Sequence, residues 1–406
     1  MEYNNRVFII GAGFSKALAN GPLASELLFE IDKASRENPK FITGSGSYYN
    51  DRIHFIKIIN HIKKIIKNGC ANLSDVDITN LDDEGIIKST NIELLCTILD
   101  LNINSAFIPK GKKVDLQGCP IPYLEGFYDL ELKGALKFIK HHIIKLLLPE
   151  RLSPKQDLLD KILTCIKPGD TIITFNYDLL IEQELWKRKL WNPFEGYGIK
   201  FPEPERKGNI PENQIQILKL HGSINWVPKT RDSFTFPFKH FGLSYKHPFG
   251  NTYYFDNLIS RDDDKMAKRE YYPLDSYLIY PTYIKYFEER WQYEIMSKAI
   301  DSLSKAKMIF ILGYSFPEAD SISNMLLTQI SNSTKIYIIV KGDAIKISGR
   351  LKEMFDLTHI IAENSTIEDW IRSDFEFKEF RKNIEKKAKL LCRMERSCKL
   401  NKTNSR

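Results

Sequence analysis

The sequence contains no pair of cysteines at the spacing of a metal site. Its six cysteines are scattered through 406 residues, and no Cys-x-x-Cys motif occurs. Structural zinc sites usually take closely spaced cysteine pairs, and disulfide frameworks are typical of small secreted domains. We therefore expect no zinc ribbon, no disulfides and a reducing compartment.

Long apolar runs are also missing. No stretch of roughly 18 apolar residues occurs, as a transmembrane helix would need. The first six residues lead directly into an apolar, strand-like segment, without the apolar core of a secretory leader. The sequence therefore predicts a cytoplasmic protein that has no membrane partner.

Acidic residues are scarce only near the C-terminus. Residues 378–406 hold 11 Lys or Arg and 3 Asp or Glu, a net charge of +8, whereas the whole chain carries +7. The basic charge therefore belongs to this tail. Such a segment is either a solvated, partly helical terminus or a surface that attracts nucleic acid or an acidic partner.

The most informative segment that is present lies at residues 7–15. An apolar strand pattern at 7–10 is followed by Gly11-Ala12-Gly13-Phe14-Ser15 and then by a helical pattern through Leu28. This order predicts a helix N-terminus whose backbone N–H groups can approach a phosphate. An ordinary tight turn between strand and helix gives the same pattern. The dehydrogenase fingerprint is not matched, because its third glycine is Lys16 here.

Five short, apolar, β-branched segments predict buried parallel strands. They are residues 7–10, 171–175, 215–220, 308–312 and 335–340. Helical patterns separate them, as at 178–189 and 288–305, and continuous apolar strands fit a sheet that is covered on both faces. The predicted fold class is α/β, a Rossmann-like doubly wound parallel sheet with ligands beyond the carboxyl ends of its strands.

The predicted strands leave two long interruptions. Segments 53–66, 92–101 and 132–148 have apolar residues at three- and four-residue spacing, so we expect a helical insertion at 31–169. The second interruption, 228–275, is an aromatic-rich insertion loop. The Rossmann-like domain would then comprise 1–30 and 170–365, and 366–406 would form a basic C-terminal helical extension.

Polar residues follow the later strands. Asn176 and Asp178, in Thr-Phe-Asn-Tyr-Asp, are either site residues at the carboxyl end of a strand or N-caps of the next helix. His221, in Leu-His-Gly-Ser, is either a catalytic base or a hydrogen-bonded structural histidine. The turn Gly313-Tyr314-Ser315-Phe316 either binds a ligand or is a simple loop.

Taken together and in this order, the four motifs resemble the sirtuin-like NAD-binding superfamily. More narrowly, they are similar to its prokaryotic defence-associated branch of NAD⁺ hydrolases. Glu93, in Asn-Ile-Glu-Leu-Leu, and Pro281, in Ile-Tyr-Pro-Thr, are also similar to that branch. The resemblance covers residues 6–30 and 170–345.

The resemblance implies a role for each motif. Gly11, Ala12, Gly13 and Ser15 would hold the NAD pyrophosphate, and Gly313 and Ser315 would meet the adenosine side. Asn176 and Asp178 would face the nicotinamide ribose, and His221 would be the general base. The expected catalytic residues are therefore Asn176, Asp178 and His221, and Phe14 and Thr174 complete the expected NAD-binding set.

Some positions depart from the protein-deacylating sirtuins. The segment after the glycine turn is Gly21-Pro22-Leu23-Ala24-Ser25 instead of Gly-Ile-Pro-Asp-Phe-Arg. Phe175 replaces the glutamine before the catalytic asparagine, the four zinc cysteines are missing, and the asparagine after the last strand is replaced near Val340-Lys341. These differences argue against deacylase activity.

The resemblance implies an NAD⁺ glycohydrolase that releases nicotinamide and ADP-ribose. NAD⁺ would be its substrate, and it would act as an anti-phage defence effector that depletes NAD⁺ in abortive infection. We expect a homo-oligomer or a complex with a helicase-like ATPase, an Argonaute or another phage sensor, with nucleic acid as a candidate ligand of the basic tail. The alternatives are a non-catalytic module that binds NAD or ADP-ribose, and an NAD-dependent deacylase.

Overall fold

The computed structural model describes fifteen parts of the chain. They are residues 5–37, 52–61, 87, 92–103, 114–116, 119–121, 124, 127–148, 151–193, 195–199, 214–228, 241–243, 278–282, 290–317 and 320–375. Residues 376–406 of the predicted C-terminal extension and most of the predicted aromatic-rich loop lie outside these residues.

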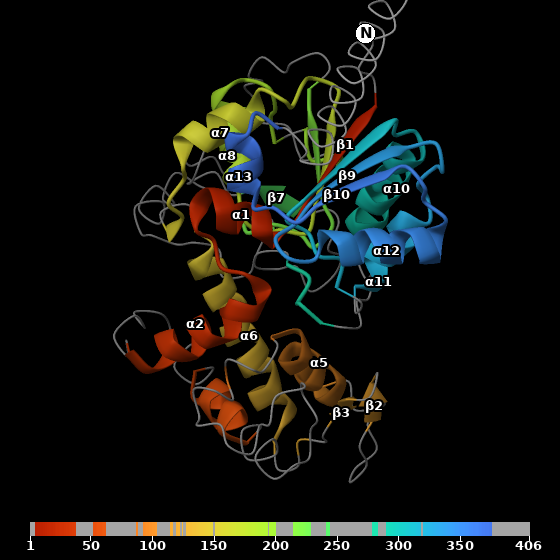
Figure 1. Cartoon of the computed structure of the whole chain (residues 1–406). Helices are drawn as coiled ribbons and strands as arrows, with labels where there is room; N and C mark the ends of the chain where they lie inside the picture. Colours follow the sequence, from red (N-terminus) through yellow and green to blue (C-terminus); the bar gives the residue numbers. More distant parts are fainter. Residues whose placement is uncertain are drawn as a thin grey trace, which may run out of the picture.

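A six-stranded, all-parallel sheet forms the centre of the molecule (Figure 1). Its strand order is β10-β9-β8-β1-β4-β5. The strands are β1 (Arg6–Ile10), β4 (Thr171–Thr174), β5 (Gln216–Lys219), β8 (Met308–Leu312), β9 (Lys335–Ile339) and β10 (Ile360–Glu363). The five predicted strands are confirmed, and the sixth, β10, is an edge strand that the sequence pattern did not indicate.

Helices cover both faces of this sheet, which explains why its inner strands are apolar throughout. One layer holds α1 (Ala12–Ala19), α7 (Gln156–Leu163), α8 (Leu180–Lys187) and α13 (Ile367–Arg372) (Figure 1). The other holds α10 (Arg290–Ser304), α11 (Ser321–Leu327) and α12 (Ala344–Phe355). The fold is therefore the predicted α/β, Rossmann-like arrangement.

The helical pattern after the glycine turn is two helices and not one. α1 ends at Ala19, where Asn20 takes a left-handed conformation with a φ of 55°, and α2 (Ala24–Glu37) begins after Pro22. Asparagine tolerates the left-handed region, and a proline cannot donate a backbone hydrogen bond to continue a helix. The chain therefore turns away from the sheet at this point.

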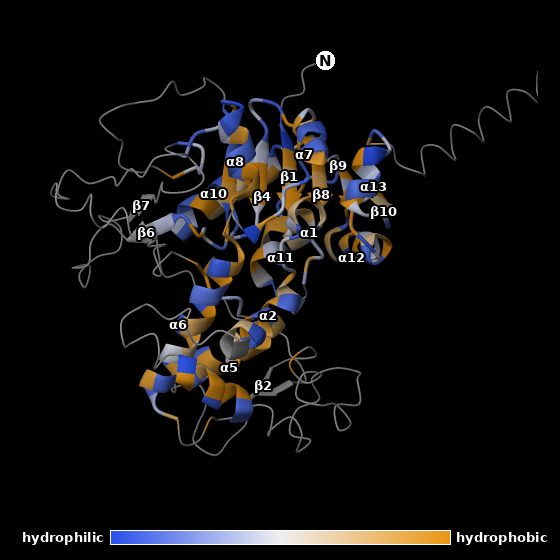
Figure 2. Cartoon of the chain, turned by 90° about the vertical axis from the view of Figure 1, so that its left-hand side faces the viewer, coloured by the Kyte–Doolittle hydropathy of each residue, from blue (hydrophilic) through white to orange (hydrophobic). Residues whose placement is uncertain are grey.

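A second, helical unit lies beyond the carboxyl ends of the strands (Figures 1 and 2). It contains α2, residues 52–61, α5 (Ile92–Ile103), α6 (Asp129–Leu146) and a small hairpin of β2 (Val114–Leu116) and β3 (Cys119–Ile121). Its apolar side chains form their own core cluster, which includes Phe55, Leu95 and Phe138. Separately, β6 (Trp226–Pro228) pairs with β7 (Phe241–Leu243) in an antiparallel arrangement.

The helical cluster also takes in three residues of the sheet unit. Tyr177 and Leu179 follow β4, and Ile224 follows β5. The backbone amide of Ile224 donates to the carbonyl oxygen of Tyr177, 3.2 Å away. The segments after β4 and β5 are therefore held between the two units. None of the described helices combines the length and the apolar character that crossing a membrane requires.

Candidate functional site

Two glycine turns interlock at the carboxyl edge of the sheet. The amide of Gly11 donates to the carbonyl oxygen of Leu312 (3.1 Å), and that of Gly13 donates to the carbonyl oxygen of Gly313 (2.9 Å). A Cβ atom on Gly11 would lie 2.6 Å from the Gly313 oxygen. Gly313 itself has a φ of +63°. The missing side chains thus allow β1 and β8 to end in direct backbone contact.

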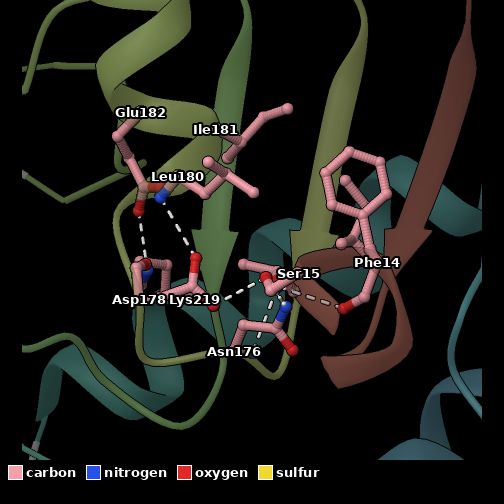
Figure 3. Close-up of a pocket in the computed structure, with 10 residues that line it drawn as sticks. Phe14, Ser15, Asn176, Asp178, Leu180, Ile181, Glu182 and Lys219 are labelled. Carbon is pink, nitrogen blue, oxygen red and sulfur yellow. Dashed lines mark hydrogen bonds and ion pairs between the residues drawn. The ribbon is translucent and has the colours of Figure 1, made fainter. Parts of the chain in front are cut away.

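Asn176 forms hydrogen bonds to the first glycine turn (Figure 3). Its amide nitrogen Nδ2 donates to the carbonyl oxygen of Gly11 (3.0 Å) and to Oγ of Ser15 (3.1 Å). A carbonyl oxygen can only accept, so the amide orientation is fixed by its partner. Both Nδ2 hydrogens are used within the protein, and the carbonyl oxygen Oδ1 faces away from this network.

Ser15 and Asp178 continue the network. The hydroxyl of Ser15 donates to Oδ2 of Asp178 (2.7 Å), and the backbone amide of Leu180 donates to Oδ1 of the same carboxylate (3.1 Å). The carboxylate of Asp178 therefore links the first residue of α8 to the glycine turn, and its role as a site residue stays a prediction. All three polar side chains, of Ser15, Asn176 and Asp178, are buried.

A buried ion pair lies behind Asp178. The ammonium of Lys219 is 2.6 Å from Oε1 of Glu182 and donates to the backbone carbonyl oxygen of Asp178 at 2.5 Å. Both side chains are 1% exposed. Burial raises the pKa of Glu182, and the Lys219 ammonium opposes that rise. A fixed cation thus holds the segment that carries Asp178.

These groups line a small cavity (Figure 3). Ten residues surround it: Ile10, Phe14, Ser15, Thr174, Asn176, Asp178, Leu180, Ile181, Glu182 and Lys219. Its volume is about 10 Å³, enough for roughly one water molecule. Pockets that hold organic ligands measure roughly 300–1,000 Å³, so this cavity alone does not accommodate a dinucleotide.

His221 does not line that cavity, but it lies against both neighbours of Asn176. Its ring meets Phe175 edge-on at a centroid distance of 5.1 Å and lies 6.2 Å from the ring of Tyr177. Its atom Nε2 is 3.7 Å from Oδ2 of Asp320. The imidazole is therefore enclosed by aromatic rings and faces a carboxylate.

Two tyrosines of this aromatic cluster stay protonated. Burial raises the pKa of Tyr177 and of Tyr314 well above the usual value. Nearby carboxylates, Glu93 of α5 and Asp320, add to the rise in both cases. Both phenols therefore act as hydrogen-bond donors: Tyr177 to the carbonyl oxygen of Ile279 (2.6 Å) and Tyr314 to Oδ2 of Asp320 (2.7 Å).

The structure brings most of the sequence-predicted residues to one sheet edge, but they differ in burial and in hydrogen bonding. Phe14 is 1% exposed within the sheet core, and the Thr174 hydroxyl donates to the carbonyl oxygen of Ile10. Ala12 is half-buried at the first position of α1, and Ser315 is exposed. Gly11, Gly13 and Gly313 form the interlocked turns described above.

Sequence reasoning missed three charged groups at this edge. Lys219 and Glu182 are 37 residues apart in the sequence. Asp320 is the N-cap of the short helix α11, which carries no clear sequence pattern. One signal was available for Lys219, because a lysine in an otherwise apolar strand needs a buried partner. Among the described residues, no three His, Cys, Asp or Glu side chains gather as metal ligands would.

Part of the chain matches a known protein family. Residues 170–360 match a family model described as a SIR2-like domain. This range carries Asn176, Asp178, His221 and Gly313, whereas the first glycine turn lies outside it. SIR2-like domains typically belong to NAD-dependent enzymes, so an NAD-related function is supported in broad terms. No curated protein sequence matches the chain significantly.

Proposed function

We propose that this protein is an NAD⁺ glycohydrolase that cleaves the nicotinamide–ribose bond. One observation carries the proposal: Asn176, fixed by the glycine turn of β1, lies between two aromatic residues that both contact His221. An amide and an imidazole are thus held at one carboxyl edge within a SIR2-like region. Ligands of doubly wound sheets bind at such edges.

Cleavage of this bond depends more on the positioning of the substrate and of the attacking water than on a strong nucleophile. The leaving nicotinamide is cationic, so the bond is already activated, and cleavage passes through an oxocarbenium-like state. Oδ1 of Asn176 can accept a hydrogen bond from a ribose hydroxyl or from the attacking water. His221 would take the proton from that water or hydroxyl as ADP-ribose forms. The carboxylate of Asp178 adds negative charge near the developing cation.

Access to the site must change on binding. The cavity beside Asn176 holds about one water molecule, so the dinucleotide would lie over the carboxyl edge and the loops after β4 and β8 would move apart. A closed resting form agrees with an effector that must not consume NAD⁺ before infection. We propose that an oligomer or a phage-sensing partner opens it, and that NAD⁺ depletion is its defence function.

The test is incubation of purified protein with NAD⁺, alone and with the products of its neighbouring genes. Nicotinamide and ADP-ribose are measured by chromatography, which also separates linear from cyclic product. We expect Asn176→Ala and His221→Ala to lower turnover by roughly 10²–10⁴-fold. The exposed residues Asn332 and His359 supply matched controls, Asn332→Ala and His359→Ala, which should retain full activity.

Other results would point elsewhere. Unchanged nicotinamide release in Asn176→Ala and His221→Ala would refute the assigned roles. Tight NAD⁺ binding by calorimetry without any product would favour a module that binds NAD or ADP-ribose as a signal. Release of O-acetyl-ADP-ribose from an acetylated peptide would identify a deacylase.

A further inference from the structure

Asp320 reaches His221 from a distant part of the chain. It is the N-cap of α11, and α11 follows β8, whereas His221 follows the edge strand β5, which β1 and β4 separate from β8. The segment after β8 therefore meets the segment after β5 at the carboxyl edge of the sheet. It delivers Oδ2 of Asp320 to 3.7 Å from Nε2 of His221, and Asp320 is 3% exposed.

The carboxylate of Asp320 is held on two sides. The hydroxyl of Tyr314 donates to Oδ2 (2.7 Å), and the backbone amide of Ser323 approaches Oδ1 (3.4 Å). The Ser323 hydroxyl donates to the backbone carbonyl oxygen of Asp320 (2.8 Å). Because its position is set by these contacts, the carboxylate can in turn set the position of the imidazole.

Aromatic rings pack around this pair, whose side chains are 10% (His221) and 4% (Asp320) exposed. Phe175 stacks on Tyr314 with a centroid distance of 4.2 Å and an interplanar angle of 2°, and its edge meets His221. Charge interactions are stronger in such surroundings than in water. Among the residues that the structure describes, the other titratable groups that act on the cluster are the protonated phenols of Tyr177 and Tyr314, the carboxylate of Glu93 and the thiol of Cys96.

We propose that Asp320 is a positioning residue that orients His221 and stabilises the imidazolium formed when His221 accepts a proton. This inference rests on the proposed function. In this step a proton moves from the attacking water or ribose hydroxyl to a nitrogen of the His221 imidazole. The carboxylate of Asp320 compensates the positive charge of the resulting imidazolium. Hydrogen bonds of catalytic groups are often long in ligand-free structures, and 3.7 Å is a distance from which such a bond can shorten.

Asp320→Asn is the informative variant, because asparagine keeps the size and the N-cap preference but loses the charge. We expect kcat for NAD⁺ cleavage to fall by roughly 10–100-fold, with KM changed less than about twofold. A carboxylate favours the charged imidazolium, so the acidic limb of the pH–rate profile should move to lower pH by about one unit. Asp320→Glu, which restores the charge, should move the limb back toward the wild type.

The control is Asp157→Asn, the same change at an exposed position in the first turn of α7. It should leave kcat and the profile unchanged. A fall in kcat for Asp320→Asn with an unmoved limb would mean a merely structural role and would overturn the proposal, as would wild-type kinetics. If Asp320→Asn does not fold, Asp320→Ser also supplies a capping oxygen without charge.

A second measurement separates this proposal from the proposed function. The ring of His221 is titrated by NMR in the wild type and in Asp320→Asn, without NAD⁺. A lower midpoint in the variant supports the pair even if the protein cleaves no NAD⁺. Equal midpoints overturn the pairing even if NAD⁺ is cleaved.

Discussion

Lys219 places a positive charge inside the sheet core, where only paired charges are tolerated. Lys219→Met would leave Glu182 as a buried carboxylate without its counterion, so we expect a loss of about 3–5 kcal/mol in the free energy of unfolding. Replacing both partners, in Lys219→Met/Glu182→Leu, should recover most of that loss. Urea denaturation of the two variants measures the difference.

The matched control is the exposed ion pair between Asp301 of α10 and Lys305, which follows the helix. Lys305→Met should change stability little, because exposed pairs are screened by solvent. A double variant no more stable than Lys219→Met would show that Lys219 acts mainly through the Asp178 carbonyl group.

Gly313 offers a second test at the scale of one residue. In Gly313→Ala the new Cβ would lie 2.4 Å from the backbone nitrogen of Phe14, at a φ of +63°. We expect a loss of about 2–4 kcal/mol, from backbone strain and from separation of the interlocked turns. Gly342→Ala is the control: its φ is +90°, but nothing lies within 4 Å of the added atom. Equal losses in the two variants, measured by thermal denaturation, would show that the close contact of the turns contributes no stability.

At the scale of elements, the sequence predicts five of the six strands, but it does not predict the edge strand, the break between α1 and α2, or the contact between Asp320 and His221. Five apolar segments between turn residues indicated five strands, because most of their side chains are buried. The sequence pattern does not indicate β10, because most of its residues are only half-buried at the sheet edge. The pattern also does not separate α1 from α2, because the break depends on the backbone conformation of Asn20. Asn176 and His221 stood out as polar residues at strand ends. Asp320 did not, because its contact with His221 exists only in the folded chain.

α6 carries two buried histidines that make stability depend on pH. Burial lowers the pKa of His141 to about 3 and that of His142 to about 4. The unfolded chain binds these protons near pH 6.5 and the folded protein does not, so stability is complete above pH 6.5 and is lost as the pH falls toward 3–4. At pH 5 the cost is about 2 kcal/mol for each histidine.

Denaturation curves between pH 7 and pH 4.5 test this expectation. His141→Leu should reduce the pH dependence, whereas His359→Gln, at an exposed position, should not. A wild-type curve that is flat over this range would contradict the burial of neutral histidines in α6.

At the scale of the whole molecule, the two units are joined through the candidate site. Tyr177, Leu179 and Ile224 belong to the helical core cluster, although they follow strands of the sheet. The turns that hold Asn176 and His221 therefore depend on both cores. This connection predicts cooperative unfolding and a site that responds to changes in the helical unit.

Tryptophan fluorescence can test this coupling, because all five tryptophans lie in or against the sheet cluster. Leu95→Ala removes a fully buried side chain from α5, in the helical cluster, and should cost about 2–5 kcal/mol. If the units unfold together, the fluorescence midpoint falls as far as it does in Leu159→Ala, an equivalent change in α7 within the sheet cluster. If the units are independent, the helical signal in circular dichroism falls at lower temperature and the fluorescence midpoint stays at its wild-type value.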